Sequence, residues 1–204
     1  MKQTTTEYNC PAWINFLNEV TNGNDEAVKQ LQEFAGSCLA PQSCWGKALV
    51  LSGKGWGKTV FVKILREMVG TEKTSYVANS GFKNEFLRAE LKDKWLNTST
   101  LGSPDELDDA YFKCIVTGEF VTASVMHGDS FHFSPTCKLV LETSTLSVEN
   151  RRCLTIDFGY RPASPARDLF HELLKEIDAI RDWAYEGLKR LIDQDCFSQG
   201  NKAD

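Results

Sequence analysis

The stretch that decides the fold of this chain is Ser52-Gly53-Lys54-Gly55-Trp56-Gly57-Lys58-Thr59. It follows the apolar run Ala48-Leu49-Val50-Leu51 and precedes the run Val60-Phe61-Val62-Lys63-Ile64-Leu65. A short apolar run bounded by glycine is typical of a buried strand, and the run after the loop has helical spacing. The sequence therefore predicts a strand, a glycine-rich loop and a helix within residues 46–70.

The end of this stretch, Gly57-Lys58-Thr59, is the signature of a phosphate-binding loop, although Ser52 stands where the pattern usually opens with glycine. Backbone N–H groups of a tight glycine loop and the N-terminal end of the following helix cradle anionic phosphates. We expect residues 52–59 to bind a nucleoside triphosphate, with Lys58 on the β- and γ-phosphates and the Thr59 hydroxyl on Mg²⁺. The alternative, a turn that is merely rich in Gly and Lys, fits the flanking strand and helix less well.

Composition places the chain among ordinary globular proteins. Its 204 residues suffice for one good-sized domain, and 42% of them are hydrophobic. The formal net charge is −5, so the chain lacks the excess of basic residues found in many nucleic-acid-binding proteins. Local basic patches are compatible with this charge. The seven cysteines are scattered, odd in number and form no C-x-x-C pair, which argues against a zinc site or disulfide framework and favours reduced thiols.

We expect a cytoplasmic protein that makes no contact with a membrane. The amino-terminal residues 1–7 lack the apolar core of a signal peptide. No apolar stretch approaches the length of a membrane-spanning helix. Reduced thiols fit the same compartment.

The apolar periodicity divides the chain into three parts. Residues 1–45 have the pattern of a helical lead-in, with apolar residues at helical spacing on both sides of a turn at residues 21–24. Strands alternate with helices through residues 46–164, and residues 165–204 form a closing helical segment with a frayed tail. This alternation predicts an α/β fold, a layered sandwich around a largely parallel sheet, with helices at both ends.

Within the central part, the pattern predicts further strands and helices besides a β-hairpin over residues 121–133. The hairpin carries His127-Gly128-Asp129 at its tip, between two apolar arms. The last two expected strands carry charged residues at one end. The first strand ends in Glu142, and the second begins with Arg151 and Arg152. The expected strands cover residues 75–78, 95–98, 137–142 and 151–158, and the expected helices cover residues 86–91 and 105–115.

Five segments stand in the same order as in one known family. Phe112-Lys113-Cys114-Ile115-Val116-Thr117-Gly118-Glu119-Phe120-Val121-Thr122-Ala123 is close to that family's segment FKKLTGGDPITA, and Phe131-His132-Phe133-Ser134-Pro135-Thr136-Cys137-Lys138-Leu139-Val140-Leu141 is similar to its segment FEFKPTFKLVLATN. The other three cover residues 31–39, 91–97 and 182–191. Together they resemble the superfamily-three helicase domain at the carboxyl end of phage, plasmid and poxvirus primase–helicases, from about residue 12 to residue 192.

This resemblance implies a phosphate-loop NTPase fold of the AAA+ type, a three-layer sandwich that assembles into a homo-oligomeric, hexameric ring. A replication protein is the expected partner in the alternative, an ATP-binding module without sustained turnover. The resemblance implies that ATP and Mg²⁺ bind at Lys58 and Thr59, between subunits. It also implies that Arg151 or Arg152 acts in trans and stabilises transition-state charge at the neighbour's nucleotide.

The resemblance further implies that the hairpin touches single-stranded DNA, with Met126 and His127 near its tip. The chain departs from the family here, because the tip lacks arginine and lysine, and a phosphate backbone is held mainly by such cations. A simple β-hairpin without a DNA contact is therefore the alternative. The two arginines at residues 151 and 152 likewise have an alternative, a surface salt-bridge pair.

The chain also departs from the family at the second nucleotide motif. The strand that usually ends in a metal-holding acid reads Asn97-Thr98-Ser99-Thr100-Leu101, and Asp105 and Glu106 follow several residues later. Glu142 stands where the family has a small residue; it could supply the missing charge, end a strand in solvent or form a structural ion pair. The family's sensor asparagine is Ser144 here, whose side chain has a shorter reach.

Two functions are expected from these observations. The first is an ATP-driven helicase domain in the DNA replication of a phage, plasmid or other mobile element. The second is a hydrolysis-poor ATP-binding module derived from such a helicase, because loss of a positioned base typically costs about 10²–10⁴ in rate. A small-molecule kinase is permitted by the phosphate loop, but neither the helical lead-in nor the hairpin suggests it.

Overall fold

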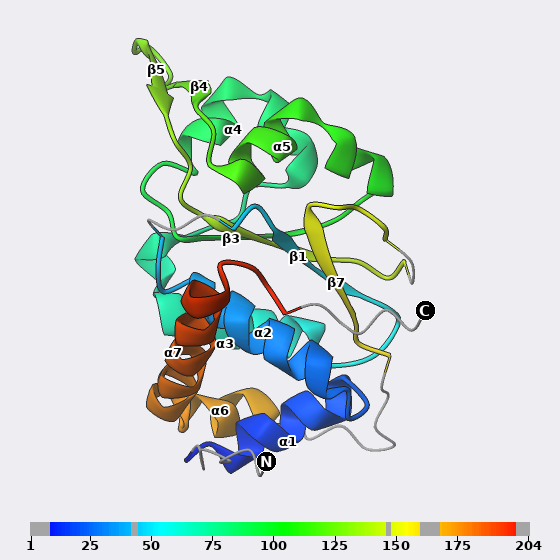
Figure 1. The fold of residues 1–204 in the computed structure, drawn as a ribbon. Coiled ribbons are helices and arrows are strands. Elements are labelled where there is room, and N and C mark those ends of the chain that lie inside the picture. Colours follow the sequence, from blue (N-terminus) through cyan, green and yellow to red (C-terminus); the bar gives the residue numbers. More distant parts are fainter. Residues whose placement is uncertain (1–8, 42–44, 146–147, 160–167, 199–204) are drawn as a thin grey trace.

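A five-stranded sheet forms the middle layer of the molecule (Figure 1). The computed structural model describes residues 9–41, 45–145, 148–159 and 168–198. The strands are β1 (Ala48–Ser52), β2 (Thr74–Ser75), β3 (Leu96–Thr100), β6 (Lys138–Glu142) and β7 (Cys153–Asp157). They lie in the order β2-β3-β6-β1-β7, and every pairing is parallel. The prediction of an α/β sandwich with a largely parallel sheet is thereby confirmed.

Helices cover both faces of this sheet (Figure 1). Below it in Figure 1, the lead-in and closing helices join the helix that follows the phosphate loop: α1 (Pro11–Val20), α2 (Asp25–Ser37), α3 (Lys58–Val69), α6 (Leu169–Leu174) and α7 (Ile177–Gln194). Above it lie 3₁₀ turns and short helices: η2 (Asn79–Lys83), α4 (Glu85–Ala89), η3 (Pro104–Asp108) and α5 (Ala110–Thr117). The turn η1 (Thr71–Lys73) connects α3 to β2.

The sheet carries a hydrophobic core on each side because successive side chains of a strand point to opposite faces. In β6, Val140 packs with the lower helices, whereas Leu139 and Leu141 pack with the upper ones. All five residues of β1 are buried. Continuous apolar runs of this kind are typical of parallel strands that are covered on both faces.

The lead-in and closing helices pack directly on each other through two glycines. A Cβ atom at Gly36 of α2 would lie 2.4 Å from the carbonyl oxygen of Ala184 in α7. A Cβ atom at Gly187 of α7 would lie 2.4 Å from the carbonyl oxygen of Gln32. The two helices therefore approach so closely that only glycine fits at either position.

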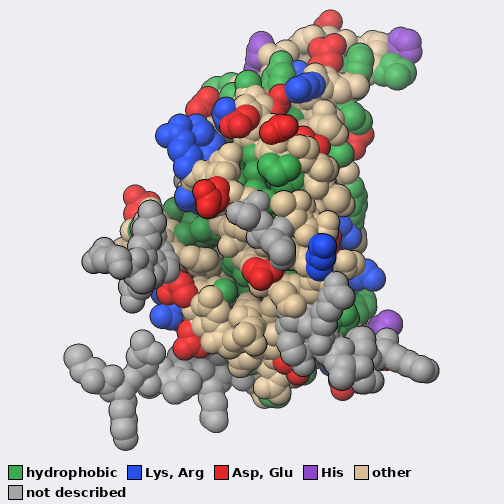
Figure 2. Space-filling view, turned by 90° about the vertical axis from the view of Figure 1, so that its right-hand side faces the viewer, with side chains coloured by type: hydrophobic (Ala, Val, Ile, Leu, Met, Phe, Trp, Pro, Cys, Tyr) green, Lys and Arg blue, Asp and Glu red, His purple; other side chains and the backbone are tan. Residues whose placement is uncertain are grey.

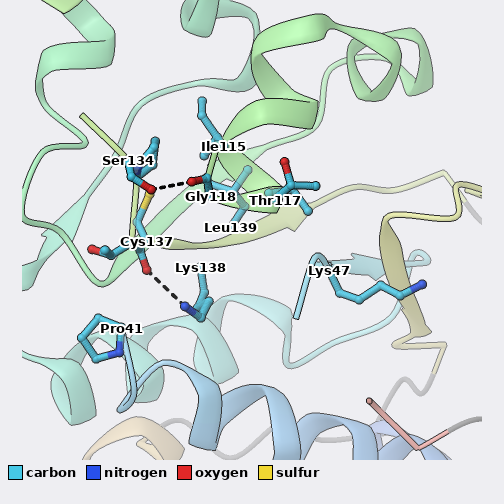
Figure 3. A pocket seen from close by; sticks show the side chains of 12 residues that line it. Pro41, Lys47, Ile115, Thr117, Gly118, Ser134, Cys137, Lys138 and Leu139 are labelled. Atoms are coloured by element: carbon cyan, nitrogen blue, oxygen red, sulfur yellow. Dashed lines mark hydrogen bonds between the residues drawn. The ribbon is translucent and has the colours of Figure 1, made fainter. Parts of the chain in front are cut away.

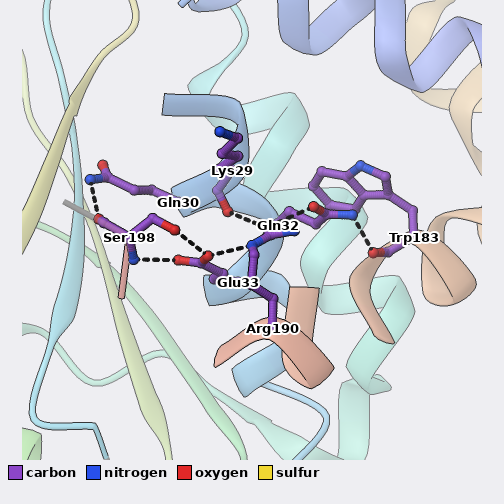
Figure 4. Close-up of polar contacts among 7 residues, drawn as sticks. All are labelled: Lys29, Gln30, Gln32, Glu33, Trp183, Arg190 and Ser198. Atoms are coloured by element: carbon purple, nitrogen blue, oxygen red, sulfur yellow. Dashed lines mark hydrogen bonds and ion pairs between the residues drawn. The ribbon is translucent and has the colours of Figure 1, made fainter. Parts of the chain in front are cut away.

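A buried ion pair joins the same two helices (Figure 4). The Glu33 carboxylate is fully buried and accepts a hydrogen bond of 2.6 Å from Arg190 Nε. It also accepts 2.8 Å from the Ser198 backbone N–H and 2.6 Å from the Ser198 hydroxyl. These bonds offset the cost of burying the charge and hold the chain after α7 against α2.

The predicted hairpin is present above the sheet, as β4 (Val121–Ser124) and β5 (Ser130–Phe133). The strands are antiparallel, with Val121 opposite Phe133 and Ser124 opposite Ser130. The first arm is two residues shorter than the predicted span of residues 121–126, and β4 packs against α4.

Three further elements differ from the prediction for a local reason. The helix expected over residues 105–115 is divided into η3 and α5, because the Asp109 side chain caps the start of α5. The strand expected over residues 75–78 ends at Ser75, because the Asn97 side chain bonds both backbone groups of Val77, accepting from its N–H at 2.8 Å and donating to its carbonyl at 3.0 Å. The closing helix is broken at residues 175–176. There Glu176 caps α1 by accepting from the N–H groups of Ala12 and Trp13, at 3.1 and 2.9 Å.

Parts of the expected segments lie outside the described residues: the amino-terminal residues 1–8, residues 160–167 at the start of the closing segment, and the tail 199–204. The division into three parts stays a prediction. Across the helices that the structure describes, none combines the length and apolar character that crossing a membrane requires.

Candidate functional site

The glycine-rich loop joins the carboxyl end of β1 to the first turn of α3, as the sequence predicts. Gly53 has φ 90° and Gly57 has φ 98°, which is the left-handed region that glycine adopts without strain. A Cβ atom at Gly55 would lie 1.7 Å from the carbonyl oxygen of Phe158, just beyond β7. The loop therefore lies against the end of β7 and leaves no room for a side chain at its middle glycine.

The lead-in helix α1 supports the loop from the other side. The Trp56 ring packs edge-on against Phe16 of α1, with centroids 5.9 Å apart. A Cβ atom at Gly57 would lie 2.5 Å from a methyl group of Val20. Two of the eight loop residues thus pack on α1, which fixes the start of α3 relative to the sheet.

The two polar side chains of the signature bond in different directions. The Lys58 ammonium donates to the carbonyl oxygens of Gly53 and Gly55, so it lies over its own loop. The Thr59 hydroxyl donates to Glu142 Oε2 at 3.0 Å. The first arrangement places a cation at the loop, and the second joins the expected metal ligand to a carboxylate.

Glu142 reaches Thr59 because of its place in the sheet. It ends β6, which lies between β1 and β3, and it stands opposite Leu51 of β1 and Thr100 of β3. Its side chain points to the face that α3 covers, as that of Val140 does two residues earlier. Three roles were considered for Glu142: a replacement for the missing acid, a strand end in solvent and a structural ion pair. In the structure its carboxylate lies beside the phosphate loop and accepts from the Thr59 hydroxyl.

The other residues of the loop have distinct surroundings. The Ser52 side chain is fully buried and donates to the carbonyl oxygen of Ile156 in β7 at 3.3 Å, so it faces the sheet. Lys54 is exposed. Ser144 is exposed after the end of β6, and the neighbouring Thr145 carbonyl accepts from Gly53 N–H at 3.4 Å. Lys54 and Ser144 are therefore open to solvent, whereas Ser52 is not.

Sequence reasoning missed one carboxylate at this site, that of Asp157. It ends β7 opposite Ser52, and a Cβ atom at Gly53 would lie 2.1 Å from its Oδ1. Its position was available in principle, because the carboxyl ends of neighbouring parallel strands meet at one edge of a sheet. Sequence reasoning considered only the two arginines at the amino end of this strand and did not examine the acid at its carboxyl end.

Arg151 and Arg152 lie at the opposite edge of the sheet from the phosphate loop. They precede β7, whose first residue Cys153 stands opposite Ala48 at the start of β1. The five residues of β7 separate them from the loop edge by about 16 Å of strand. Arg151 is exposed, and its carbonyl oxygen accepts from the Lys47 ammonium. The structure does not bring these arginines to the phosphate loop of their own chain.

A cavity of about 190 Å³ lies near this second edge (Figure 3). It is lined by the end of α5, the start of β6 and Lys47, and Ser134 closes one side by donating to the Gly118 carbonyl. Lys138 donates to the Thr136 carbonyl at 3.2 Å. Burial raises the pKa of the neighbouring Cys137 thiol to about 12. This cavity is separate from the phosphate loop.

The predicted DNA-contacting residues lie at the hairpin tip, far from the loop. Met126 is 75% exposed, and His127 adopts a left-handed backbone with φ 62°. Phe131 on the second arm lies under the Lys92 ammonium, 4.9 Å from it. The structure therefore presents apolar and aromatic groups here, with the Lys92 charge supplied from outside the hairpin.

One protein family and several solved structures are similar to this chain. The model of DUF5906, a family of unknown function, matches residues 50–152, which include the whole loop, Glu142 and both arginines. No curated protein matches the chain significantly in sequence.

The fold is similar to that of solved structures of the NrS-1 C-terminal region. The apo A form has a TM-score of 0.71 and 13% identity, over 87% of this chain and 47% of that chain. A second apo structure has a TM-score of 0.68 and 14% identity, over 92% and 51%. A JCV helicase structure has a TM-score of 0.47 and 13% identity, over 93% and 70%, which is too distant to carry an argument. The chain spans about half the length of the NrS-1 chains, and the likeness shows a shared fold.

Proposed function

The chain belongs to the DUF5906 family, a family of unknown function, and we propose that it binds ATP with Mg²⁺ at its phosphate loop. The hydrogen bond of 3.0 Å between Thr59 and Glu142 carries this proposal. A hydroxyl beside a carboxylate, with an ammonium at the same loop, is the donor set that a metal-bound triphosphate requires. The glycines add a backbone cradle in which side chains would collide.

In this proposal Thr59 would hold the Mg²⁺, and Lys58 would hold the terminal phosphates. The metal would neutralise the charge of the phosphates. The ammonium of Lys58, which bonds loop carbonyls here, would exchange at least one of them for a phosphate oxygen. Glu142 would also orient the attacking water and accept its proton, a role that the end of β3 cannot fill without a carboxylate.

We propose further that the protein is a helicase-like ATPase that acts on single-stranded DNA in the replication of a phage, plasmid or other mobile element. The separation of Arg151 and Arg152 from their own loop supports an assembly in which they act on a neighbour's nucleotide. A closed ring of identical subunits, a hexamer, provides that arrangement. The hairpin, with Met126 and His127 at its tip, would contact the strand inside such a ring.

Steady-state ATP hydrolysis, measured with and without single-stranded DNA, tests this function. We expect turnover that DNA stimulates and that Lys58→Ala abolishes, since the variant loses the phosphate-binding cation. Native mass measurement with a non-hydrolysable ATP analogue checks the assembly. Calorimetry that shows no nucleotide binding at millimolar ATP with Mg²⁺ present would refute the proposal.

A hydrolysis-poor ATP-binding module is the second candidate function. Two observations favour it: β3 ends without a carboxylate, and residues 125–129 at the hairpin tip include no lysine or arginine. Such a module would bind ATP, change its affinity for a replication protein and turn over slowly. Two results together identify such a module. The protein binds nucleotide without DNA-stimulated turnover, and Glu142→Gln leaves this behaviour unchanged.

A further inference from the structure

Strand β7 forms one edge of the five-stranded sheet. Among the strands that the structure describes, it pairs with β1 alone, and it ends the order β2-β3-β6-β1-β7. Figure 2 views the molecule from this side, and backbone and uncharged polar side chains make up much of the middle of that face. An edge strand presents a row of backbone N–H and C=O groups with which another strand can pair.

The outward row of β7 belongs to alternate residues. The Arg152 carbonyl accepts from β1 at 2.8 Å, and the Phe158 N–H donates to β1 at 3.0 Å. Because residues of a parallel strand face one neighbour in alternation, the even-numbered residues between these two also face β1. The backbone groups of Cys153, Thr155 and Asp157 therefore face away from the sheet.

Thr155, at the centre of this row, has backbone groups that no other part of the described chain uses. Neither its N–H nor its carbonyl has a hydrogen-bond partner within the described residues. Thr155 is exposed, although its hydroxyl donates to the Val148 carbonyl at 2.8 Å. Backbone groups without a protein partner bond to water, so a second strand can take the place of this water.

The two ends of β7 carry opposite charges. The exposed Arg151 lies in the turn before the strand, and the strand ends in the exposed Asp157. About 16 Å of strand separates the two ends, so these charges cannot pair within one chain. Neither side chain forms an ion pair with any residue that the structure describes. The edge therefore has an unpaired cation at one end and an unpaired anion at the other.

We propose that two copies of this chain pair through their β7 edges, antiparallel and with a two-fold axis at Thr155, into a dimer with one continuous sheet. In an antiparallel hydrogen-bonded pair the two residues exchange both N–H···O bonds, so Thr155 bonds to the partner's Thr155. The same register places Asp157 opposite the partner's Cys153, next to the turn that carries the partner's Arg151. Each Asp157 thus meets an arginine, once on either side of the axis, as a two-fold interface requires.

The charges also select the direction of the pairing. A parallel arrangement would place Arg151 beside the partner's Arg151 and Asp157 beside the partner's Asp157, and like charges across a strand pair are destabilising. The dimer needs neither nucleotide nor DNA, so this inference goes beyond the proposed function and does not depend on it. An arginine that is paired in this way cannot serve a neighbour's nucleotide, so the dimer and the proposed ring are separate assemblies.

Sedimentation equilibrium without nucleotide or DNA tests this proposal. We expect a monomer–dimer equilibrium that Thr155→Pro abolishes, because the variant loses the central outward N–H. That N–H faces away from β1, so the variant keeps its own sheet, and proline is tolerated on such edges. Thr155→Val keeps the N–H and should still dimerise. A protein that stays monomeric at millimolar concentration, or a dimer that survives Thr155→Pro, would overturn the proposal.

Two charge reversals test the register without a proline. Arg151→Glu and Asp157→Arg, each alone, place like charges at both ends of the pairing and should weaken the dimer by about tenfold. Mixed in equal amounts, the two variants should form a heterodimer as strong as the parent dimer, because the two original charges meet at one end and the two introduced charges at the other. If the mixture associates no better than either variant alone, the strand ends do not meet and the assignment is wrong. Thermal unfolding of each variant verifies that it is folded.

Discussion

At the scale of residues, the chemistry of the site depends on a hydrogen bond between side chains 83 positions apart, those of Thr59 and Glu142. Strand β6 lies between β1 and β3, so an acid at its end is one strand nearer to the phosphate loop than an acid on β3 would be. The carboxylate missing from the end of β3 is thus present one strand away. In the proposed function, the charge of Glu142 would therefore decide between a motor and a slow module.

We predict that Glu142→Gln lowers ATP turnover by about 10²–10⁴ while the protein still binds ATP. The amide keeps an acceptor for the Thr59 hydroxyl but carries no charge and cannot take a proton. Turnover and nucleotide affinity are measured separately, at saturating Mg²⁺. Glu149→Gln, an exposed acid beyond β6, is the matched control. Equal turnover in the variant and the parent protein would show that Glu142 has no role in the reaction.

We also predict that stability falls as pH rises above about 9. Burial raises the pKa of the Cys38, Cys137 and Cys153 thiols from the ordinary 9.0 to about 12. Between these values the unfolded chain has released protons that the folded chain keeps, so the free energy of unfolding falls by up to about 1.4 kcal/mol per pH unit for each thiol. Urea unfolding at pH 8 and pH 10 measures the slope. Cys153→Ala should reduce the slope, and an unchanged slope would contradict this account.

At the scale of elements, the lead-in helix α2 and the closing helix α7 behave as one unit. Gly36 and Gly187 allow their backbones to meet, and the buried Glu33 is satisfied by Arg190 and Ser198. Helix α1 in turn packs on the phosphate loop through Phe16. The helices at the two ends of the chain therefore support the loop on which the proposed chemistry depends.

We predict that Arg190→Met destabilises the protein by about 3–5 kcal/mol, because it leaves the Glu33 carboxylate buried without its cation. Lys189→Met is the matched control. Lys189 pairs with Glu186 on the surface, where both side chains are exposed, so its loss should cost about 1 kcal/mol or less. Chemical unfolding of both variants gives the two values. Equal losses would mean that the pair with Glu33 contributes no more than a surface contact.

At the scale of the whole molecule, the phosphate loop and the two arginines lie at opposite edges of one sheet. A single subunit cannot bring them together without unfolding β7. The proposed hydrolysis therefore requires at least two subunits, each of which supplies what the other lacks. The formal charge of −5 does not oppose this assembly at moderate ionic strength, because exposed charges are screened over about 8–10 Å.

We predict that two inactive variants restore activity when they are mixed. Lys58→Ala loses its own nucleotide site, and the double variant Arg151→Ala with Arg152→Ala loses the residues offered to a neighbour. In a mixed assembly, some interfaces combine an intact phosphate loop with intact arginines, so ATP turnover should return in part. The ratio of the variants is varied while total protein stays constant. No recovery at any ratio, in assemblies shown to be mixed by mass, would rule out action in trans.

The sequence by itself determined the layered α/β class, the strand–loop–helix at residues 46–70 and the hairpin, because apolar periodicity and glycine placement are local properties of the chain. The loop residues could be chosen for the same reason, since their chemistry lies within eight consecutive positions. Only the tertiary structure decided that Glu142 meets Thr59, that Asp157 lies against Gly53 and that the arginines face away. Each of these depends on strand order and register, which arise from long-range packing and leave no mark in any single segment.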